Sequence, residues 1–358
     1  MSQHLAPQLA GDIERAAALL DKAGCPVASH RITGDLRHHA ALNLRRLDAQ
    51  APPFKLPKRF TAEALAKSAE ALFEKFDRSI PPSIPALATL ALEQLRLSRA
   101  EPVRKAIMAA ALLAEDMPNN AYHNATHIRE VLSNVVMLSG VNDRKTRNNA
   151  RFSAPLSAKE QARLILAAIA HDLGHDGGSN MVPNGKGGTR RVPYRLEAKS
   201  VRMLKPVMKQ AGMSRADMAE VEVMILATDP GGPHKAVMQA LDHHFSSKPL
   251  PARFPKRLKA LKSSKRLSVM CGLMCDSDIL GSAGLTLNIN RLQTERLSKE
   301  WGRKMGAEDT IGFLTHVVGM RFCTAAGHVF DPNLKRIHKE AMVARGKPDL
   351  SSRGPTRS

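Results

Sequence analysis

Aromatic residues are scarce in this chain of 358 residues, because phenylalanine, tryptophan and tyrosine together make up only 4% of it. A core therefore has to be built from leucine, alanine, valine, isoleucine and methionine, a composition that favours packed helices over a β-sandwich. The four cysteines form no CxxC pair, which argues against a zinc ribbon and a dense disulfide framework. The longest apolar run, Ala106 to Ala114, is far shorter than the ~20 residues that span a bilayer. Asp12 and Glu14 stand where a signal peptide would be apolar, so the sequence predicts a soluble, cytoplasmic protein.

Acidic residues are also few relative to basic ones, since 33 Asp and Glu face 54 Lys and Arg and leave a formal net charge of +21. A field of this sign attracts anions such as small phosphoesters, nucleic acids and acidic membrane faces. Two stretches contain no acid at all: the glycine-rich stretch 181–195, and 246–266 with eight Lys or Arg. The first is interpreted as a solvated loop. Its functional alternative is a mouth in which Lys186, Arg190 and Arg191 attract phosphate.

The chain contains a succession of helical patterns with no convincing strand alternation, which predicts an all-α fold. One helix is predicted over Asn124–Leu138, ending at Gly140, and Ser157 with Glu160 forms a capping box for a helix that runs into Ala170. Residues 1–60 are predicted to be an N-terminal extension, and 61–330 the main helical body. Residues 331–358 are predicted to be a basic C-terminal tail, partly disordered, above all over 348–358.

The placement of the histidines indicates a metal site. His123 and His127 lie at i and i+4, so that on a helix they point the same way, one turn apart. The apolar helix predicted over Leu164–Ala170 delivers His171 and Asp172 at its end. Ionisable groups at the end of a buried helix are costly unless something pairs with them. Neutral imidazole together with carboxylate is a ligand set for Zn, Mn, Fe or Mg, so a metal explains the pattern best.

A further ligand is predicted on the largely apolar helix Val269–Leu280, which carries Asp276 and Asp278. These two lie about 200° apart around a helix, so only one can face a metal. Each motif alone has an ordinary interpretation, such as a surface His pair or a solvated Asp, but their joint occurrence favours the metal site. Cys271 and Cys275 are interpreted as helix packing, since no second pair of Cys or His stands nearby.

In this order the motifs resemble the signatures of the cyclic-nucleotide phosphodiesterases, which belong to the HD superfamily of metal-dependent phosphohydrolases. The resemblance covers roughly residues 112–280 and implies that 61–330 is an HD/phosphodiesterase-like helical bundle that forms the catalytic domain. The segments that carry it are Tyr122-His123-Asn124-x-x-His127, similar to YHNxxHAxDV; His171-Asp172-Leu173-Gly174-His175, similar to HDxxHxGxxN; Leu196-Glu197, similar to the start of LExHH; and Leu226-Ala227-Thr228-Asp229, similar to LATD.

The resemblance implies two divalent metal ions (Zn, Mg, Mn or Fe). His127, His171 and Asp172 would bind the first ion tightly, and Asp172 would bridge to a second ion held largely through waters. Asp278 fits the family's closing ligand, because a small residue precedes it and an aliphatic one follows, and Asp276 is the alternative.

The resemblance also assigns three catalytic residues. His123 would be the general acid that protonates the leaving oxygen, His175 would orient the bridging water, and Glu197 would hold His123 in position. A metal-bridging hydroxide would then attack the phosphorus, a chemistry that two metals support at neutral pH.

The sequence departs from the family pattern at several positions. Glu130 stands where the family has Asp, 198–200 breaks the LExHH segment, and His234 lies one residue farther from the LATD segment. Thr310 stands in place of the late Gln that clamps the purine, and the last Gln of the chain is Gln293. Metal chemistry is therefore more strongly indicated than specificity for cyclic nucleotides.

These observations predict a metal-dependent phosphodiesterase that converts a 3′,5′-cyclic nucleotide to its 5′-monophosphate, with a small anionic phosphoester as its partner. One alternative is an HD phosphohydrolase that acts on another nucleotide or phosphoester. Another is a basic nucleic-acid or membrane-surface binding protein on an inactive HD scaffold. The low aromatic content argues against base stacking, so nucleic acid is the less favoured partner.

Overall fold

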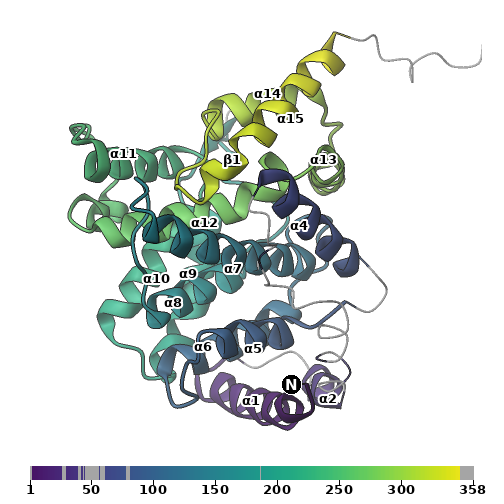
Figure 1. Cartoon of the computed structure of the whole chain (residues 1–358). Helices are drawn as coiled ribbons and strands as arrows, with labels where there is room; N and C mark the ends of the chain where they lie inside the picture. Colours follow the sequence, from purple (N-terminus) through teal and green to yellow (C-terminus); the bar gives the residue numbers. More distant parts are fainter. Residues whose placement is uncertain are drawn as a thin grey trace, which may run out of the picture.

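The structure is a computed structural model, and it describes residues 2–25, 30–38, 42, 44, 56, 61–77, 81–185 and 187–346. The fold is helical, as predicted, and Figure 1 shows how its helices pack against one another. The helices are α1 (Ser2–Lys22), α2 (His30–His38), α4 (Ala62–Phe76), α5 (Ile84–Gln94), α6 (Pro102–Glu115), α7 (Ala125–Arg147), α8 (Ala158–Ala170), α9 (Arg195–Gln210), α10 (Arg215–Ala227), α11 (Gly232–Ser246), α12 (Lys265–Ala283), α13 (Leu287–Trp301), α14 (Ala307–Gly312) and α15 (Asp331–Arg345). Shorter helical segments are η1 (Lys256–Lys262) and η3 (Gly327–Phe330), which are 3₁₀, and η2 (Phe313–Val317), a π-helical turn.

Helix α8 lies at the centre of the bundle, packed against α6, α7 and α10. Its residues from Leu166 to Ala170 are completely buried. Each fully buried leucine or isoleucine contributes about 1.5–3 kcal/mol relative to an exposed one. The predicted capping box is confirmed, because the Ser157 hydroxyl accepts from the Glu160 amide and the Glu160 carboxylate accepts from the Ser157 amide. The helix is thus fixed at its start and buried along its length, and it carries His171 at a rigid end.

The predicted end of the helix at Gly140 is wrong, since α7 continues through this glycine to Arg147. Glycine in a helix interior costs about 1 kcal/mol relative to alanine. Here it allows close packing, because a Cβ at Gly140 would lie 3.0 Å from Leu56 Cδ1. Packing therefore outweighs the local propensity to stop.

The glycine-rich stretch after α8, interpreted from the sequence as a loop, forms a small antiparallel hairpin. Strand β1 (Met181–Pro183) pairs with β2 (Thr189–Arg191) in the register Met181↔Arg191 and Pro183↔Thr189. Gly185 and Gly187 at its turn have φ of +72° and +78°, a conformation that suits glycine. Arg190 and Arg191 are thus held on a folded projection.

The helices on both sides of the predicted boundaries pack on the same core. From α1, Leu9, Ile13 and Leu20 are fully buried, and α1 contacts α6. From α15, Leu334 and Ile337 are fully buried. The division of the chain at residues 60 and 330 stays a prediction. The stretch 348–358, predicted to be disordered, lies outside the described residues. Among the helices that the structure describes, none is long and apolar enough to cross a bilayer.

Candidate active site

Three helices bring the four predicted metal ligands together. His127 lies in the first turn of α7, His171 and Asp172 follow α8, and Asp278 lies on α12. The Nε2 atom of His127 is 3.2 Å from Asp278 Oδ1 and 3.5 Å from Asp172 Oδ2. The Nε2 atom of His171 is 3.3 Å from each of the same two oxygens. Two imidazoles and two carboxylates therefore converge on one point.

The start of α7 fixes the position of His127. Asn124 caps this helix, and its side-chain oxygen accepts from the amides of Thr126, at 2.8 Å, and of His127, at 3.2 Å. An Asn cap contributes about 1 kcal/mol and sets the first helical turn. The histidine is therefore held at a defined helix start and is buried.

The structure separates the two aspartates of α12. Asp276 is fully buried on the opposite face, where it accepts from the amides of Cys323, at 2.7 Å, and Thr324, at 2.9 Å, and from the Thr324 hydroxyl at 2.7 Å. These hydrogen bonds use both oxygens of the carboxylate and stabilise the turn before η3. Asp278 is the aspartate that faces the histidines.

The donor set of this cluster fits a divalent cation. Among the described residues, His171 Nε2 and Asp172 Oδ2 are buried atoms that make no hydrogen bond. The Ala168 carbonyl lies 2.9 Å from His171 Nδ1 and can only accept, so the Nε2 lone pair is directed at the cluster. Buried polar groups without partners are costly, and a cation among His127, His171 and Asp172 would satisfy them.

The electrostatics of the cluster agree with this fit. Burial raises the pKa of Asp172, but the charges of His171 and His123 outweigh it and hold this pKa well below its usual range. Burial lowers the pKa of His171, yet the two carboxylates raise it well above its usual range. This group of side chains thus attracts a positive charge strongly, and a cation bound there would displace the proton.

A second pair of histidines stands beside the cluster. The rings of His123 and His175 stack with centroids 3.5 Å apart. Burial is the main cause that lowers the pKa of His175 to about 4, so its imidazole is neutral at neutral pH. The Gly177 amide donates to His175 Nδ1 at 3.2 Å, which leaves Nε2 as the protonated nitrogen.

The carboxylate that holds His123 belongs to Glu300, at the end of α13. Its Oε1 lies 2.5 Å from His123 Nδ1, and its Oε2 accepts from the backbone amides of Tyr122, at 2.7 Å, and His123, at 2.9 Å. Burial raises the pKa of Glu300, but the hydrogen bonds and charge of His123 outweigh it and lower the pKa overall. The sequence analysis missed this residue, because no local pattern marks it.

The predicted contact between Glu197 and His123 is therefore corrected. Glu197 lies in the first turn of α9, directly after the hairpin, where its carboxylate accepts from Asn180 Nδ2 at 3.1 and 3.2 Å. Burial, followed by the charge of Asp229, raises the pKa of Glu197 to about 7. This carboxylate belongs to the wall of the cavity, and the position beside His123 is taken by Glu300.

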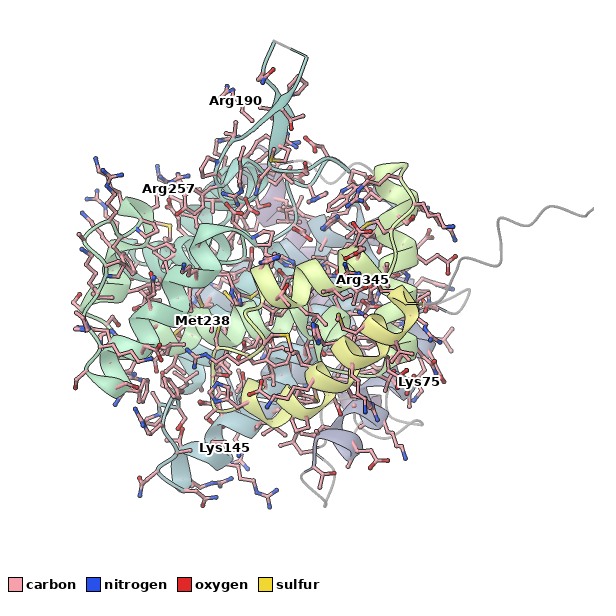
Figure 2. All side chains as sticks on the ribbon, turned by 90° about the horizontal axis from the view of Figure 1, so that it is seen from above. Lys75, Lys145, Arg190, Met238, Arg257 and Arg345 are labelled. Carbon is pink, nitrogen blue, oxygen red and sulfur yellow. The ribbon has the colours of Figure 1, made fainter. Side chains whose placement is uncertain are left out.

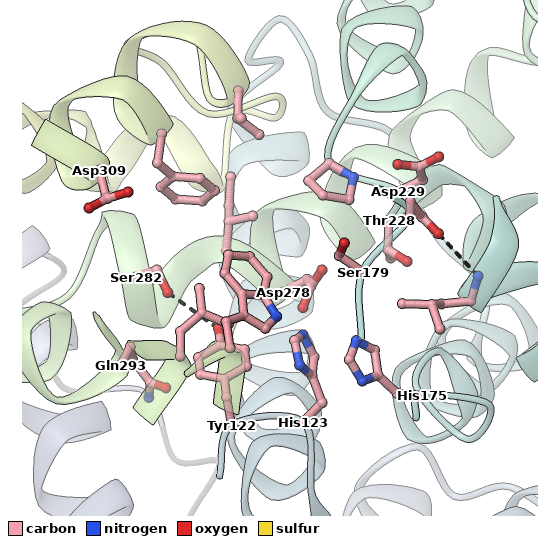
Figure 3. Close-up of a pocket in the computed structure, with 18 of the residues that line it drawn as sticks. Tyr122, His123, His175, Ser179, Thr228, Asp229, Asp278, Ser282, Gln293 and Asp309 are labelled. Atoms are coloured by element: carbon pink, nitrogen blue, oxygen red, sulfur yellow. Dashed lines mark hydrogen bonds between the residues drawn. The ribbon is translucent and has the colours of Figure 1, made fainter. Parts of the chain in front are cut away.

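A cavity of about 540 Å³ opens over these groups, a size within the range of small-molecule sites. Figure 3 shows His123 and His175 between two walls, with Gln293 and Asp309 on one side and Thr228 and Asp229 on the other. The cavity lining also includes Thr310, the residue that stands in place of the family's late Gln. Gln293, which also lines the cavity, donates from Nε2 to the buried Glu130 at 2.8 Å.

Two predictions outside the cavity can also be placed. His234 is buried, with its Nε2 3.5 Å from Cys323 Sγ, and it is not part of the ligand cluster. Cys271 and Cys275 are buried in α12, and Cys275 Sγ donates to the Ala227 carbonyl. This is the helix packing that the sequence predicted.

The hairpin is fastened to the cavity wall by Arg191 of β2. Its guanidinium pairs with the fully buried carboxylate of Asp229, which also accepts from the Tyr194 amide at 3.0 Å. A Cβ at Gly231 would collide with this guanidinium, so the glycine makes room for it. The neighbouring Arg190 is exposed.

We expect Arg191→Gln to lower the free energy of unfolding by about 2 kcal/mol, because it leaves the buried carboxylate of Asp229 without its cation. The matched variant Arg190→Gln changes an exposed residue on the same strand and should stay within about 0.5 kcal/mol of the wild type. Urea denaturation of both variants measures the difference. Equal stabilities would show that the pair does not fasten the hairpin.

Comparisons with known proteins identify a family for this chain. The family model described as 3′5′-cyclic nucleotide phosphodiesterase matches residues 122–321, more than half of the chain. A solved structure of LmjPDEB1 in complex with IBMX is similar in fold, with a TM-score of 0.53 and 16% identity over 77% of this chain and 91% of that one. The phosphodiesterase domain of the RhoPDE fusion protein from the choanoflagellate Salpingoeca rosetta has a TM-score of 0.49 and 17% identity over 85% of this chain and 100% of that one. No curated protein sequence matches the chain.

Proposed function

This chain belongs to the 3′5′-cyclic nucleotide phosphodiesterase family, and from that premise we propose how its own residues carry out the metal-dependent hydrolysis of a cyclic nucleotide. The observation that carries the proposal is the convergence of His127, His171, Asp172 and Asp278 on one point beside His123. These four side chains are the proposed ligands of the first divalent ion. Asp172 would also help to hold a second ion, together with water molecules.

When bound, the metal ions lower the pKa of a water molecule and take up charge on the phosphoryl oxygens. The set of two imidazoles and two carboxylates suits Zn, Fe or Mn at the first position, and a carboxylate with waters suits Mg or Mn at the second. Both the number of metal ions and their identity are proposed here.

His123 is the proposed general acid. Hydrolysis forms a bond from the water oxygen to phosphorus and breaks the bond from phosphorus to the 3′ oxygen of the ribose. The leaving alkoxide needs a proton, and His123 can supply it from Nε2 because Glu300 holds Nδ1. A positioned general acid of this kind contributes roughly 10²–10⁴-fold to the rate.

Two further residues of the cavity have proposed positioning roles. His175 stacks on His123 and keeps the plane of that ring fixed, and its protonated Nε2 is available to orient the attacking water. Glu197 lines the same cavity, and with a pKa of about 7 it can accept or donate a hydrogen bond near neutral pH. The product is the 5′-monophosphate, so no further leaving group has to be accommodated.

The substrate proposed for the cavity is a small anionic phosphoester, most specifically a 3′,5′-cyclic nucleotide. The alternative of a retired scaffold lacks support, because every predicted ligand is present and the ligand atoms meet. The proposed location is the cytoplasm. Its support is that all four cysteines are unpaired thiols, as is usual in a reducing compartment.

A metal titration tests the proposal directly. Mn²⁺ or Mg²⁺ should raise the Tm of chelator-treated protein, with a stabilisation of about 2.7 kcal/mol when the ion is at 100 times its Kd. The same ions should restore the hydrolysis of cyclic AMP and cyclic GMP, and chelator or Asp172→Ala should abolish both effects. Turnover that persists in chelator, or a Tm that rises equally in Asp172→Ala, would contradict the proposed metal site.

A further inference from the structure

The 3₁₀ segment η1 carries a row of lysines along one side. A 3₁₀-helix has three residues per turn, so side chains at i and i+3 lie directly above one another, about 6 Å apart. In η1 this places Lys256, Lys259 and Lys262 in one exposed row, while Leu258 and Leu261 are fully buried on the other side. Burial of the two leucines fixes the segment against α10, α11 and α12. The row is therefore built into the fold.

The carboxylates that the structure describes do not neutralise this row. Within the part of the chain that the structure describes, Lys256, Lys259 and Lys262 have no ion-pair partner among the residues around them. The neighbouring Arg253 and Lys265 are likewise exposed without an acidic partner. The stretch 246–266 itself contains eight Lys or Arg and no acid. Unpaired cations held this close repel one another. An anion that covers the surface relieves this repulsion and therefore binds favourably.

The residues around this row of lysines exclude base stacking and membrane insertion, so the row can bind a partner only through its charge. The ammonium groups of Lys262 and Lys265 lie over the rings of Phe254, at 5.5 Å, and Phe245, at 4.1 Å. Both rings are partly buried in the core, so they are not free to stack on nucleic acid bases. With Leu258 and Leu261 buried, no apolar side chain of the row can enter a bilayer core.

We propose that the surface formed by Arg253, Lys256, Lys259, Lys262 and Lys265, here called the lysine face, binds the headgroups of an anionic phospholipid membrane. Clusters of four to eight Lys or Arg are attracted to such membranes, and each adds about a fivefold gain in partitioning. Four of the five residues are lysines, which act as point charges for phosphates. Readout of bases relies more on arginine pairs and exposed aromatic rings, which this face lacks.

Membrane binding through this face would keep the substrate cavity close to the bilayer. Arg257 of η1 lies over the ring of Tyr194, 5.6 Å from its centre, and Tyr194 directly precedes α9 at the base of the hairpin. In Figure 2 Arg257 lies near the base of the projecting hairpin that carries Arg190, and Arg345 of α15 lies away from both. The hairpin residues Met181 and Arg191 line the cavity. The enzyme would then hydrolyse cyclic nucleotide near a membrane surface, and its chemistry does not depend on that placement.

Co-sedimentation with vesicles tests the proposal on the full-length protein. Vesicles of phosphatidylcholine with phosphatidylserine should bind the protein, phosphatidylcholine alone should not, and binding should weaken as salt is added. The variant Lys256→Glu/Lys259→Glu/Lys262→Glu should lose roughly 100-fold or more in partitioning. Its rate of cyclic nucleotide hydrolysis in solution should equal that of the wild type, which shows that it folds.

The control is a variant with the same change of charge elsewhere. Lys335, Arg336 and Lys339 are exposed on α15, and their replacement by glutamate should reduce vesicle binding by less than about 10-fold, through net charge alone. Equal losses in the two triple variants would overturn the lysine face. A face that binds duplex DNA more tightly than the phosphatidylserine vesicles at the same salt would overturn the membrane as its partner.

Discussion

Replacing Asp278 with asparagine is expected to reduce kcat for cyclic nucleotide hydrolysis by about 10³-fold or more, since metal ions contribute several kcal/mol of transition-state stabilisation. The structural reason is that Asp278 Oδ1 lies 3.2 Å from His127 Nε2 and 3.3 Å from His171 Nε2. Without its charge, the cluster loses one of the two carboxylates that attract a cation. The variant should therefore also bind less metal, measured by elemental analysis after dialysis.

The matched variant is Asp276→Asn, two residues earlier on the same helix. Asp276 accepts three hydrogen bonds with its two oxygens, from the amides of Cys323 and Thr324 and from the Thr324 hydroxyl. An asparagine offers one oxygen, so at least one buried donor would face an amide group, at a cost of about 1–3 kcal/mol. We expect a lowered Tm but a metal content close to that of the wild type.

The two aspartates thus separate stability from metal binding. The expected pattern is a metal-poor and inactive Asp278→Asn protein that matches the wild type in Tm when both are in chelator, and a metal-loaded Asp276→Asn protein that has a lower Tm than the wild type under the same conditions. The reverse pattern of metal content would assign the ligand to Asp276 and remove the proposed role of Asp278.

The same pair shows how far the sequence could predict the site. Helical periodicity places Asp276 and Asp278 on different faces, but it does not tell which face meets His127. That choice depends on the turn at Cys323 and Thr324, which lies 47 and 48 residues farther along the chain and occupies Asp276. The histidines were predictable because they stand at helix ends, where an apolar pattern stops and ionisable residues begin.

The partner of His123 could not be predicted in this way. Glu300 is 177 residues distant in sequence and lies at the end of an amphipathic helix, where an acidic residue is ordinarily solvated. The prediction of Glu197 instead followed from the family resemblance. Here the hairpin directly precedes α9 and directs the Glu197 carboxylate toward Asn180. Tertiary packing, which the local sequence does not reveal, places Glu300 beside His123 and Glu197 beside Asn180.

Replacing Glu300 with glutamine is expected to lower kcat for cyclic nucleotides by about 10²–10⁴-fold, the contribution of a general acid. The Glu300 carboxylate accepts from three donors, which are the backbone amides of Tyr122 and His123 and the Nδ1 atom of His123. A glutamine has one oxygen for them. If that oxygen stays with the two backbone amides, its NH₂ group faces Nδ1 and favours the tautomer that lacks a proton there. His123 would then have to give up its Nε2 proton without the carboxylate that stabilises the charged ring.

The dependence on the leaving group separates this role from a structural one. A nitrophenyl phosphodiester releases a stable phenolate that needs little protonation, so Glu300→Gln should lose much less activity on it than on cyclic AMP. Glu295→Gln, on the exposed side of the same helix, should leave both rates unchanged, since it removes only a surface ion pair with Lys299. Equal losses on the two substrates would mean that Glu300 supports the fold or the metal site instead of the proton transfer. A loss confined to the poor leaving group would identify Glu300 as the residue that positions the acid, because only protonation of the leaving oxygen distinguishes the two reactions.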